Sequence, residues 1–343
     1  MVTGSLFACE MSEQPAIVER LLRDGRGAFV EVAAMARSAD AAWILIAARG
    51  TSDNAARYGQ HVLGRLCGLP VALASPSLTT LYASRLRLDR ALVIGISQSG
   101  ESPDVCAVID DARAQGRPTV AITNAPASPL ARAADAVVDL GAGPERSVAA
   151  TKTYTASLAA LAALAAELAG GRDLCDQLAA VPEAMARQLA SATARAENVL
   201  SRVDRCAVTG RGPNYATAFE AALKIKELTA IVAEPFSPAD LMHGPVAVLG
   251  PASPLLAVAV GGPALASVLD AVAKARERGA RCMVLTDCEG VAGDEVLPLA
   301  VVPEWLSPLV AILPAQALAA GLAVERGVDV DAPFGLAKVT RTV

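Results

Sequence analysis

Short runs of consecutive apolar residues alternate along the chain with longer segments whose apolar residues recur at helical spacing. In the first half, the apolar runs predict strands at 42–48, 71–75, 91–97, 119–123 and 136–140. Each run is continuous rather than alternating, as is typical of parallel strands covered by helices on both faces. The segments between them end at glycine, a frequent helix terminator. The pattern therefore predicts a doubly wound parallel α/β domain.

The same alternation starts again after residue 203. Further strands are predicted at 206–210, 255–260, 282–286 and 299–302, with helices around 214–230 and 264–278. The intervening residues 172–203 carry no strand pattern and predict one or two connecting helices. Segments 44–59 and 206–221 both read as an apolar strand, an Arg-Gly turn and a helix, which indicates an internal duplication.

Composition narrows the range of partners and compartments. The 343 residues carry a net charge of −5 and no basic run, which argues against a nucleic acid or an anionic membrane as partner. Scattered cysteines without a Cys-x-x-Cys pair, and an N-terminus unlike a secretory signal, indicate a cytoplasmic protein. The longest apolar run, 306–324, contains Pro308, Pro314 and Gln316 and is expected to be a buried helix rather than a membrane span.

A cluster of polar side chains follows the strand predicted at 91–97. In open parallel sheets, ligands bind beyond the carboxyl ends of the strands, where helix N-termini present free N–H groups. A helix is predicted to open near Pro103, because proline is favoured in a first helical turn. Such a loop suits a phosphate held by neutral donors, although serine-rich turns also simply cap helices. The donors are Ser97, Gln98, Ser99 and Ser102.

Two further polar loops favour the phosphate interpretation. Residues 49–54 and 143–155 also carry hydroxyl groups between a strand and a helix. The equivalent loop in the second half, 261–267, has lost most of its donors. We therefore expect a phosphorylated small ligand to be held by the first half alone.

The second half carries the residues suited to proton transfer. Lys224 and Glu227 share a face of the helix predicted at 214–230, while Lys226 points elsewhere. His243 lies in a Met-His-Gly-Pro turn, whereas His61 lies within a helix and is interpreted as structural. A carboxylate base, an imidazole and a lysine can together isomerise a sugar phosphate. A surface ion pair beside an unrelated turn histidine is the plainer alternative.

Six motifs occur in the order seen in the sugar isomerase (SIS) superfamily: RGTS, SQSGES, GPERSVAATK, ALKIKE, MHGP and GLAKVT. The chain resembles in particular the isomerase half of glucosamine-6-phosphate synthase (glutamine–fructose-6-phosphate aminotransferase) and the SIS-type glucosamine-6-phosphate deaminases. The resemblance implies two tandem doubly wound SIS domains of the flavodoxin-like α/β/α type. The implied layout is a helical lead-in at 1–30, a phosphate-binding domain at 31–170, connecting helices at 171–203 and a second domain at 204–343 with the catalytic helix and the C-terminal tail.

The resemblance also implies a role for each matching residue. Glu227 would move the proton between C1 and C2 with Lys224 beside it, and Lys338 would form a Schiff base with the open-chain ketose. His243 would open the sugar ring from the partner subunit of a homodimer. The remaining matches are Ser97, Gln98, Ser99 and Ser102 for the phosphate, and Thr51, Ser52, Val148 and Ala149 for the sugar.

Three departures from the aminotransferase pattern bear on the activity. The 343 residues leave no room for the glutaminase domain of that enzyme, Ala150 stands where it usually has serine, and the tail reads LAKVTRTV. We therefore expect a deaminase that converts glucosamine 6-phosphate and water into fructose 6-phosphate and ammonia, with no metal or organic cofactor. The alternatives are a fructosamine-6-phosphate deglycase, an aldose–ketose phosphosugar isomerase, or a non-catalytic phosphosugar sensor.

Overall fold

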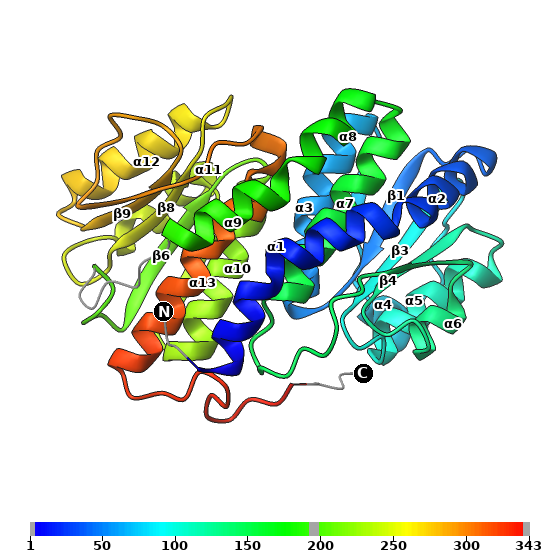
Figure 1. Ribbon diagram of the computed structural model, residues 1–343, viewed down its shortest axis with the longest axis horizontal. Helices are drawn as coiled ribbons and strands as arrows, with labels where there is room; N and C mark the ends of the chain where they lie inside the picture. The colour runs from blue at the N-terminus through cyan, green and yellow to red at the C-terminus, as the bar shows by residue number, and fades with distance from the viewer. Residues whose placement is uncertain (1–3, 192–198, 339–343) are drawn as a thin grey trace. The chain divides into compact units, whose positions relative to one another are not determined.

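The computed structural model describes residues 4–191 and 199–338 and divides the chain into two compact units. The N-terminal unit comprises Ala16–Glu145, Lys152–Ala180 and Ala337–Val343. The C-terminal unit comprises Met1–Pro15, Arg146–Thr151 and Val181–Leu336. Each unit contains one parallel sheet of five strands with helices on both faces (Figure 1). This confirms the predicted fold class of two tandem doubly wound domains.

The sheet of the N-terminal unit has the strand order β2-β1-β3-β4-β5. Helices α5 and α6 cover one face, where Val105, Ile109 and Leu130 pack against β1, β3 and β4. Helices α3 and α7 pack together on the sheet as well. The strands are β1 (Trp43–Ala47), β2 (Val71–Leu73), β3 (Ala91–Ser97), β4 (Thr119–Thr123) and β5 (Ala136–Asp139). Helix α1 (Leu6–Asp24) is divided between the two units after Pro15. The other helices are α2 (Arg26–Ser38), α3 (Gly50–Cys67), α4 (Ser77–Thr80), α5 (Pro103–Ala114), α6 (Pro129–Ala133), α7 (Lys152–Ala169) and α8 (Arg172–Ala179).

The sheet of the C-terminal unit has the order β10-β9-β8-β6-β7, so both sheets follow the flavodoxin-like order when each is read in its own chain order. Helix α12 packs against β8 and β9, and α10 packs against α13 (Figure 1). The strands are β6 (Arg205–Gly210), β7 (Val232–Phe236), β8 (Leu255–Ala259), β9 (Cys282–Thr286) and β10 (Glu295–Pro298). The helices are α9 (Val181–Ser191), α10 (Asn214–Thr229), α11 (Pro238–Met242), η1 (Pro245–Val248), α12 (Leu265–Glu277), η2 (Glu304–Leu306) and α13 (Ser307–Glu325).

Two edge strands of the C-terminal unit differ from the sequence prediction. The last strand is β10 at Glu295–Pro298, so the strand predicted at 299–302 is wrong. Strand β7 at Val232–Phe236 was not predicted, because Glu234 and Pro235 interrupt its apolar pattern. A proline is tolerated in β7 because it is an edge strand, where one side makes no ladder hydrogen bonds.

The longest apolar run forms the core helix α13, as predicted. This helix is long and apolar enough to cross a membrane, but 83% of its most apolar window is buried inside the protein. Pro308 lies in its first turn, where a missing N–H costs nothing. The buried amide of Gln316 accepts a hydrogen bond of 2.8 Å from Gln14. The predicted connecting helices are α8 and α9, and residues 192–198 of that segment lie outside the described residues.

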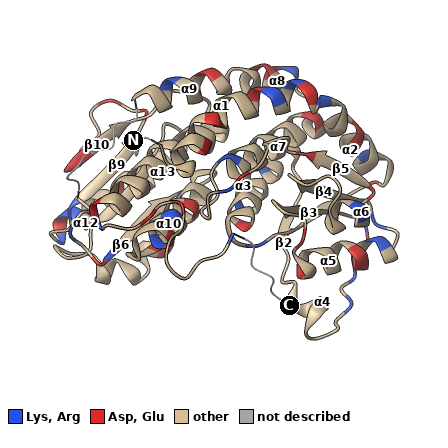
Figure 2. Cartoon of the chain, turned by 60° about the horizontal axis from the view of Figure 1, so that its bottom comes forward, with Lys and Arg blue, Asp and Glu red and all other residues tan. Residues whose placement is uncertain are grey.

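Charged side chains lie on helices and loops of both units, with acidic and basic residues interspersed, for example along α8 and α12 (Figure 2). The central strands carry almost none: all seven residues of β3 are buried. Burial of the strands on both faces therefore explains the continuous apolar runs in the sequence.

The core of the N-terminal unit predicts a large effect of truncation in β3. Ile94 is fully buried, so Ile94→Ala should lower the free energy of unfolding by about 2–5 kcal/mol in urea denaturation. Val232 is 57% exposed on the edge strand β7, and Val232→Ala should change it by less than about 0.5 kcal/mol. Equal effects of the two substitutions would contradict the packing described above.

Candidate functional site

The first part of the candidate site lies where β1 and β3 end side by side. These two strands pair in parallel. After β1 the chain continues to β2 on one side of the pair, and after β3 it continues to β4 on the other side. The carboxyl ends of β1 and β3 are therefore the topological switch point of the N-terminal unit. Open α/β sheets bind ligands at such points. The helices that follow begin here: α3 at Gly50, with Thr51 and Ser52 in its first turn, and α5 at Pro103.

The loop after β3 is folded by its own serine hydroxyl groups. The hydroxyl oxygens of Ser97 and Ser102 lie 3.3 Å apart, and the Gly100 N–H donates to Ser97 at 3.1 Å. The Glu101 N–H donates to the Ser99 hydroxyl at 3.3 Å. Ser97 is buried, whereas Gln98, Ser99 and Ser102 are partly exposed. The predicted donors therefore converge within one loop at the N-terminus of α5.

Gly100 allows this loop to close. Its φ of +63° is the left-handed conformation that favours glycine, and an added Cβ would lie 1.9 Å from the hydroxyl oxygen of Ser128. Ser128 also caps α6 through the Ala131 N–H. The loop geometry thus depends on a residue without a side chain at position 100.

An ion pair with a buried acidic member joins the two loops of the switch point. Asp104 is fully buried in the first turn of α5, and its carboxylate lies 2.5 Å from the guanidinium nitrogen Nε of Arg49, which precedes α3. The other Asp104 oxygen accepts the Val105 N–H at 2.9 Å. Arg49 is about half exposed, so this pair fixes a cation beside the loop in which the sequence showed only neutral donors.

Two other titratable groups of this unit do not suit catalysis. Burial raises the pKa of the Cys106 thiol in α5, with smaller contributions from Asp110 and Asp104, so the thiol is kept protonated. Burial lowers the pKa of His61 on α3, which favours its neutral form. Both observations agree with a packing role for these side chains.

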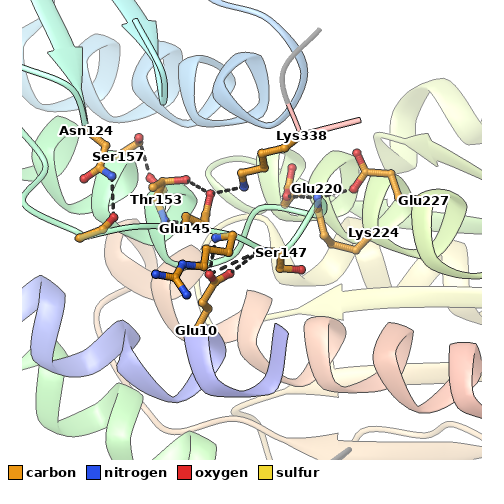
Figure 3. Close-up of polar contacts among 12 residues, drawn as sticks. Glu10, Asn124, Glu145, Ser147, Thr153, Ser157, Glu220, Lys224, Glu227 and Lys338 are labelled. Carbon is orange, nitrogen blue, oxygen red and sulfur yellow. Dashed lines mark hydrogen bonds and ion pairs between the residues drawn. The ribbon is translucent and has the colours of Figure 1, made fainter. Parts of the chain in front are cut away.

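Lys338 of the C-terminal tail binds a buried carboxylate in the N-terminal unit (Figure 3). Its ammonium lies 2.8 Å from Oε2 of Glu145, whose side chain is fully buried. The same carboxylate accepts hydrogen bonds from the backbone N–H of Thr153 at 3.0 Å and from its hydroxyl at 2.8 Å. The tail residues 339–343, which depart from the family pattern, lie outside the described residues.

The second part of the candidate site lies on α10 of the C-terminal unit (Figure 3). Lys224 is fully buried between two carboxylates, with Nζ 2.5 Å from Oε2 of Glu227 and 3.4 Å from Oε1 of Glu220. Glu220 is also fully buried, whereas the Glu227 side chain is 24% exposed. Lys226 is exposed, as predicted. The lysine therefore holds Glu227 at the surface of the unit by a charge-assisted hydrogen bond.

His243 lies directly after α11, in an exposed turn. Ser237 caps this short helix by accepting the Asp240 N–H at 3.1 Å. The imidazole is exposed, and Met242 and Val248, which lie near it in the sequence, are 43% and 52% exposed.

Glu10 binds the backbone just before the residues predicted to contact the sugar. Its buried carboxylate accepts hydrogen bonds from the N–H groups of Arg146 at 2.5 Å and Ser147 at 3.3 Å (Figure 3). Val148 is half-buried and Ala149 is buried in the segment that follows, which clusters with the C-terminal unit rather than with the loop after β3.

The equivalent edge of the C-terminal sheet carries acidic groups. The Gly261 N–H after β8 donates to the Asp287 carboxylate at 2.8 Å, and a Cβ at Gly262 would lie 2.7 Å from the Glu304 carboxyl carbon. Carboxylates at this edge disfavour an anion. That only the first half holds a phosphate stays a prediction.

Sequence reasoning missed five charged residues of these clusters: Glu10, Arg49, Asp104, Glu145 and Glu220. Glu220 was detectable, because it lies four residues before Lys224 on the same helix face. Glu145 and Lys338 are 193 residues apart, and no sequence pattern indicates that contact.

The chain is similar in sequence to known proteins of one family. Residues 39–167 and residues 199–326 each match the family model described as the SIS domain. In an alignment 356 residues long, gaps included, the chain is 35% identical to the glutamine–fructose-6-phosphate aminotransferase (isomerizing) of Gloeobacter violaceus. It is 36% identical over 346 residues to that of Shouchella clausii. Both alignments cover 96% of this chain but 57% of the relative, so the chain spans about half the length of these curated relatives.

Two solved structures are similar to this chain over nearly its whole length. A structure from Silicibacter pomeroyi DSS-3, described as a candidate phosphosugar isomerase, is 36% identical with a TM-score of 0.89, over 95% of this chain and 100% of the other. The C-terminal domain of glucosamine-fructose-6-phosphate aminotransferase from Francisella tularensis is 27% identical with a TM-score of 0.85, over 97% and 99%.

The buried charges on α10 predict a stability effect that is separate from any activity. Lys224→Met should cost about 3–5 kcal/mol in the free energy of unfolding, because it leaves the fully buried Glu220 without its counter-charge. Adding Glu220→Gln should recover much of that loss. A Lys224→Met protein as stable as wild type in urea denaturation would contradict the ion-pair geometry.

Proposed function

Because the chain belongs to the SIS domain family and carries the domain twice, we propose that it is a phosphosugar isomerase that deaminates glucosamine 6-phosphate. The overall reaction adds water and yields fructose 6-phosphate and ammonia. The observation that carries the proposal is the partly exposed carboxylate of Glu227, fixed on α10 by the buried Lys224. A carboxylate held in this way can exchange protons with a carbon acid.

The phosphate of the substrate is assigned to the loop Ser97–Ser102 and the N-terminus of α5. Hydroxyl groups, backbone N–H groups and a helix N-terminus together suit a phosphate dianion. Arg49, held by Asp104, adds one positive charge near these donors. Thr51 and Ser52 at the start of α3 are assigned to the sugar hydroxyls, and Val148 and Ala149 to packing against the sugar.

The chemistry is assigned to the remaining groups. His243 opens the ring, which gives an aldehyde at C1 and an amine at C2. Glu227 removes the proton from C2 and returns it to C1, while O1 takes up a proton from solvent and the amine releases one, so that C1 becomes a hydroxymethyl group and C2 an imine. Lys338 displaces ammonia from C2 to form a Schiff base, and water then releases the ketose and the free lysine. No step requires a second nitrogen donor.

We also assign His243 to the site of a second copy of the chain, which makes a homodimer the active form. The exposed imidazole and the exposed apolar side chains of Met242 and Val248 support this assignment. Covering such side chains with a partner contributes a favourable free energy of about 25 cal/mol per Å² of apolar area removed from water.

Glu227→Gln tests the proton-transfer role. With glucosamine 6-phosphate as substrate, ammonia release should fall by at least about 10²-fold, because the amide cannot accept the C2 proton. Glu277→Gln on the exposed face of α12 is the matched control and should retain activity. Full ammonia release by Glu227→Gln would contradict the proposal. A wild type that interconverts hexose phosphates without ammonia would instead be an aldose–ketose isomerase.

Mixing two inactive variants tests the dimer assignment. Random exchange of Glu227→Gln with His243→Ala subunits should restore about a quarter of the wild-type sites, because half of the dimers then contain one complete site. Ammonia release before and after subunit exchange measures this, with each variant alone as control. If the histidine acts within its own chain, no activity will return.

A further inference from the structure

Glu145 is a buried carboxylate to which the proposed mechanism gives no task. Its side chain is fully buried, and it pairs with Lys338, whose side chain is 22% exposed. A buried ion pair contributes little net stability, because desolvation offsets the attraction between the charges. A fully buried carboxylate paired with a partly exposed lysine is therefore a candidate for a role in orienting that lysine.

The geometry around Glu145 fixes both of its oxygens. Oε1 accepts the Thr153 N–H at 3.0 Å at the start of α7. Oε2 accepts the Thr153 hydroxyl and the Lys338 ammonium, each at 2.8 Å (Figure 3). The carboxylate therefore cannot turn away from the lysine without losing two other hydrogen bonds. The Lys338 side chain, in contrast, is 22% exposed.

We infer that Glu145 is the proton acceptor and positioning residue of Lys338, a role that rests on the proposed function. A lysine must lose a proton before its nitrogen can attack a carbonyl carbon. Glu145 takes that proton from the ammonium as the new C–N bond forms at C2. It then returns a proton to the departing oxygen, which leaves as water, or to the departing nitrogen, which leaves as ammonia. Glu145 ends the step as a carboxylate, so it is regenerated in each turnover.

This role separates two steps of the reaction. Proton exchange at C1 of fructose 6-phosphate depends on Glu227, whereas the Schiff base at C2 depends on Lys338. Loss of Glu145 should therefore impair the second step and spare the first. A residue that merely stabilises the fold would impair both steps together.

The experiment compares wild type with Glu145→Gln, using fructose 6-phosphate as the probe. Borohydride reduction with intact-protein mass spectrometry measures the Schiff base, and deuterium uptake at C1 in D₂O measures proton exchange. We expect Glu145→Gln to form the adduct at least about 10²-fold more slowly, while C1 exchange changes less than threefold. Glu167→Gln is the matched control on α7 of the same unit and should behave as wild type.

A second variant covers the case in which Glu145→Gln does not fold. Glu145→Asp keeps the charge but withdraws it from Nζ, and it should also slow adduct formation with C1 exchange retained. Adduct formation at the wild-type rate, or an equal loss of both readouts, overturns the role of Glu145 and leaves the proposed function standing. A wild type that forms no adduct overturns this role and the Schiff-base step together, and a wild type that releases no ammonia from glucosamine 6-phosphate overturns the proposed function.

Discussion

The parallel pairing of β1 with β3 is the constraint on which the candidate phosphate site depends. The two strands run in the same direction, and the chain continues from them to strands on opposite sides of the pair. The loops that follow β1 and β3 therefore lie next to each other at the carboxyl ends of the strands. This places the first turns of α3 and α5 together, with their free N–H groups and hydroxyls. Arg49 and Asp104 then join the two loops by an ion pair whose acidic partner is fully buried.

Buried charges at the other positions serve orientation rather than stability. Lys224 lies between Glu220 and Glu227, and Glu145 lies between Thr153 and Lys338. In each cluster at least one charged group is fully buried, and one member, Glu227 or Lys338, is partly exposed. Replacing all members of such a cluster by apolar side chains is often neutral or stabilising, whereas removing a single member is destabilising. The partly exposed member is therefore oriented by a buried neighbour.

The sequence was informative where local pattern and structure coincide. The central strands, α13 and the start of α5 at Pro103 followed from apolar runs, from a proline in a first turn and from glycine at helix ends. Strands β7 and β10 did not, because Glu234 and Pro235 interrupt the first and Glu295 opens the second, so that neither has a continuous apolar run. Glu145 and Asp104 were also missed, since their importance arises from contacts with Lys338 and Arg49 that only the folded chain creates. The roles expected of Glu227, His243 and Lys338 came from the family resemblance. The structure adds which residues contact them: Lys224 for Glu227 and Glu145 for Lys338.

A crystal structure with fructose 6-phosphate bound tests the central claim most directly. The claim is that neutral donors at the β1–β3 switch hold the phosphate, so that the acid–base groups act on C1 and C2 of the same sugar. We expect the phosphate within hydrogen-bond reach of the loop Ser97–Ser102, and C1 and C2 beside the carboxylate of Glu227. A phosphate bound at the acidic edge after β8, or a sugar remote from Glu227, would contradict the claim.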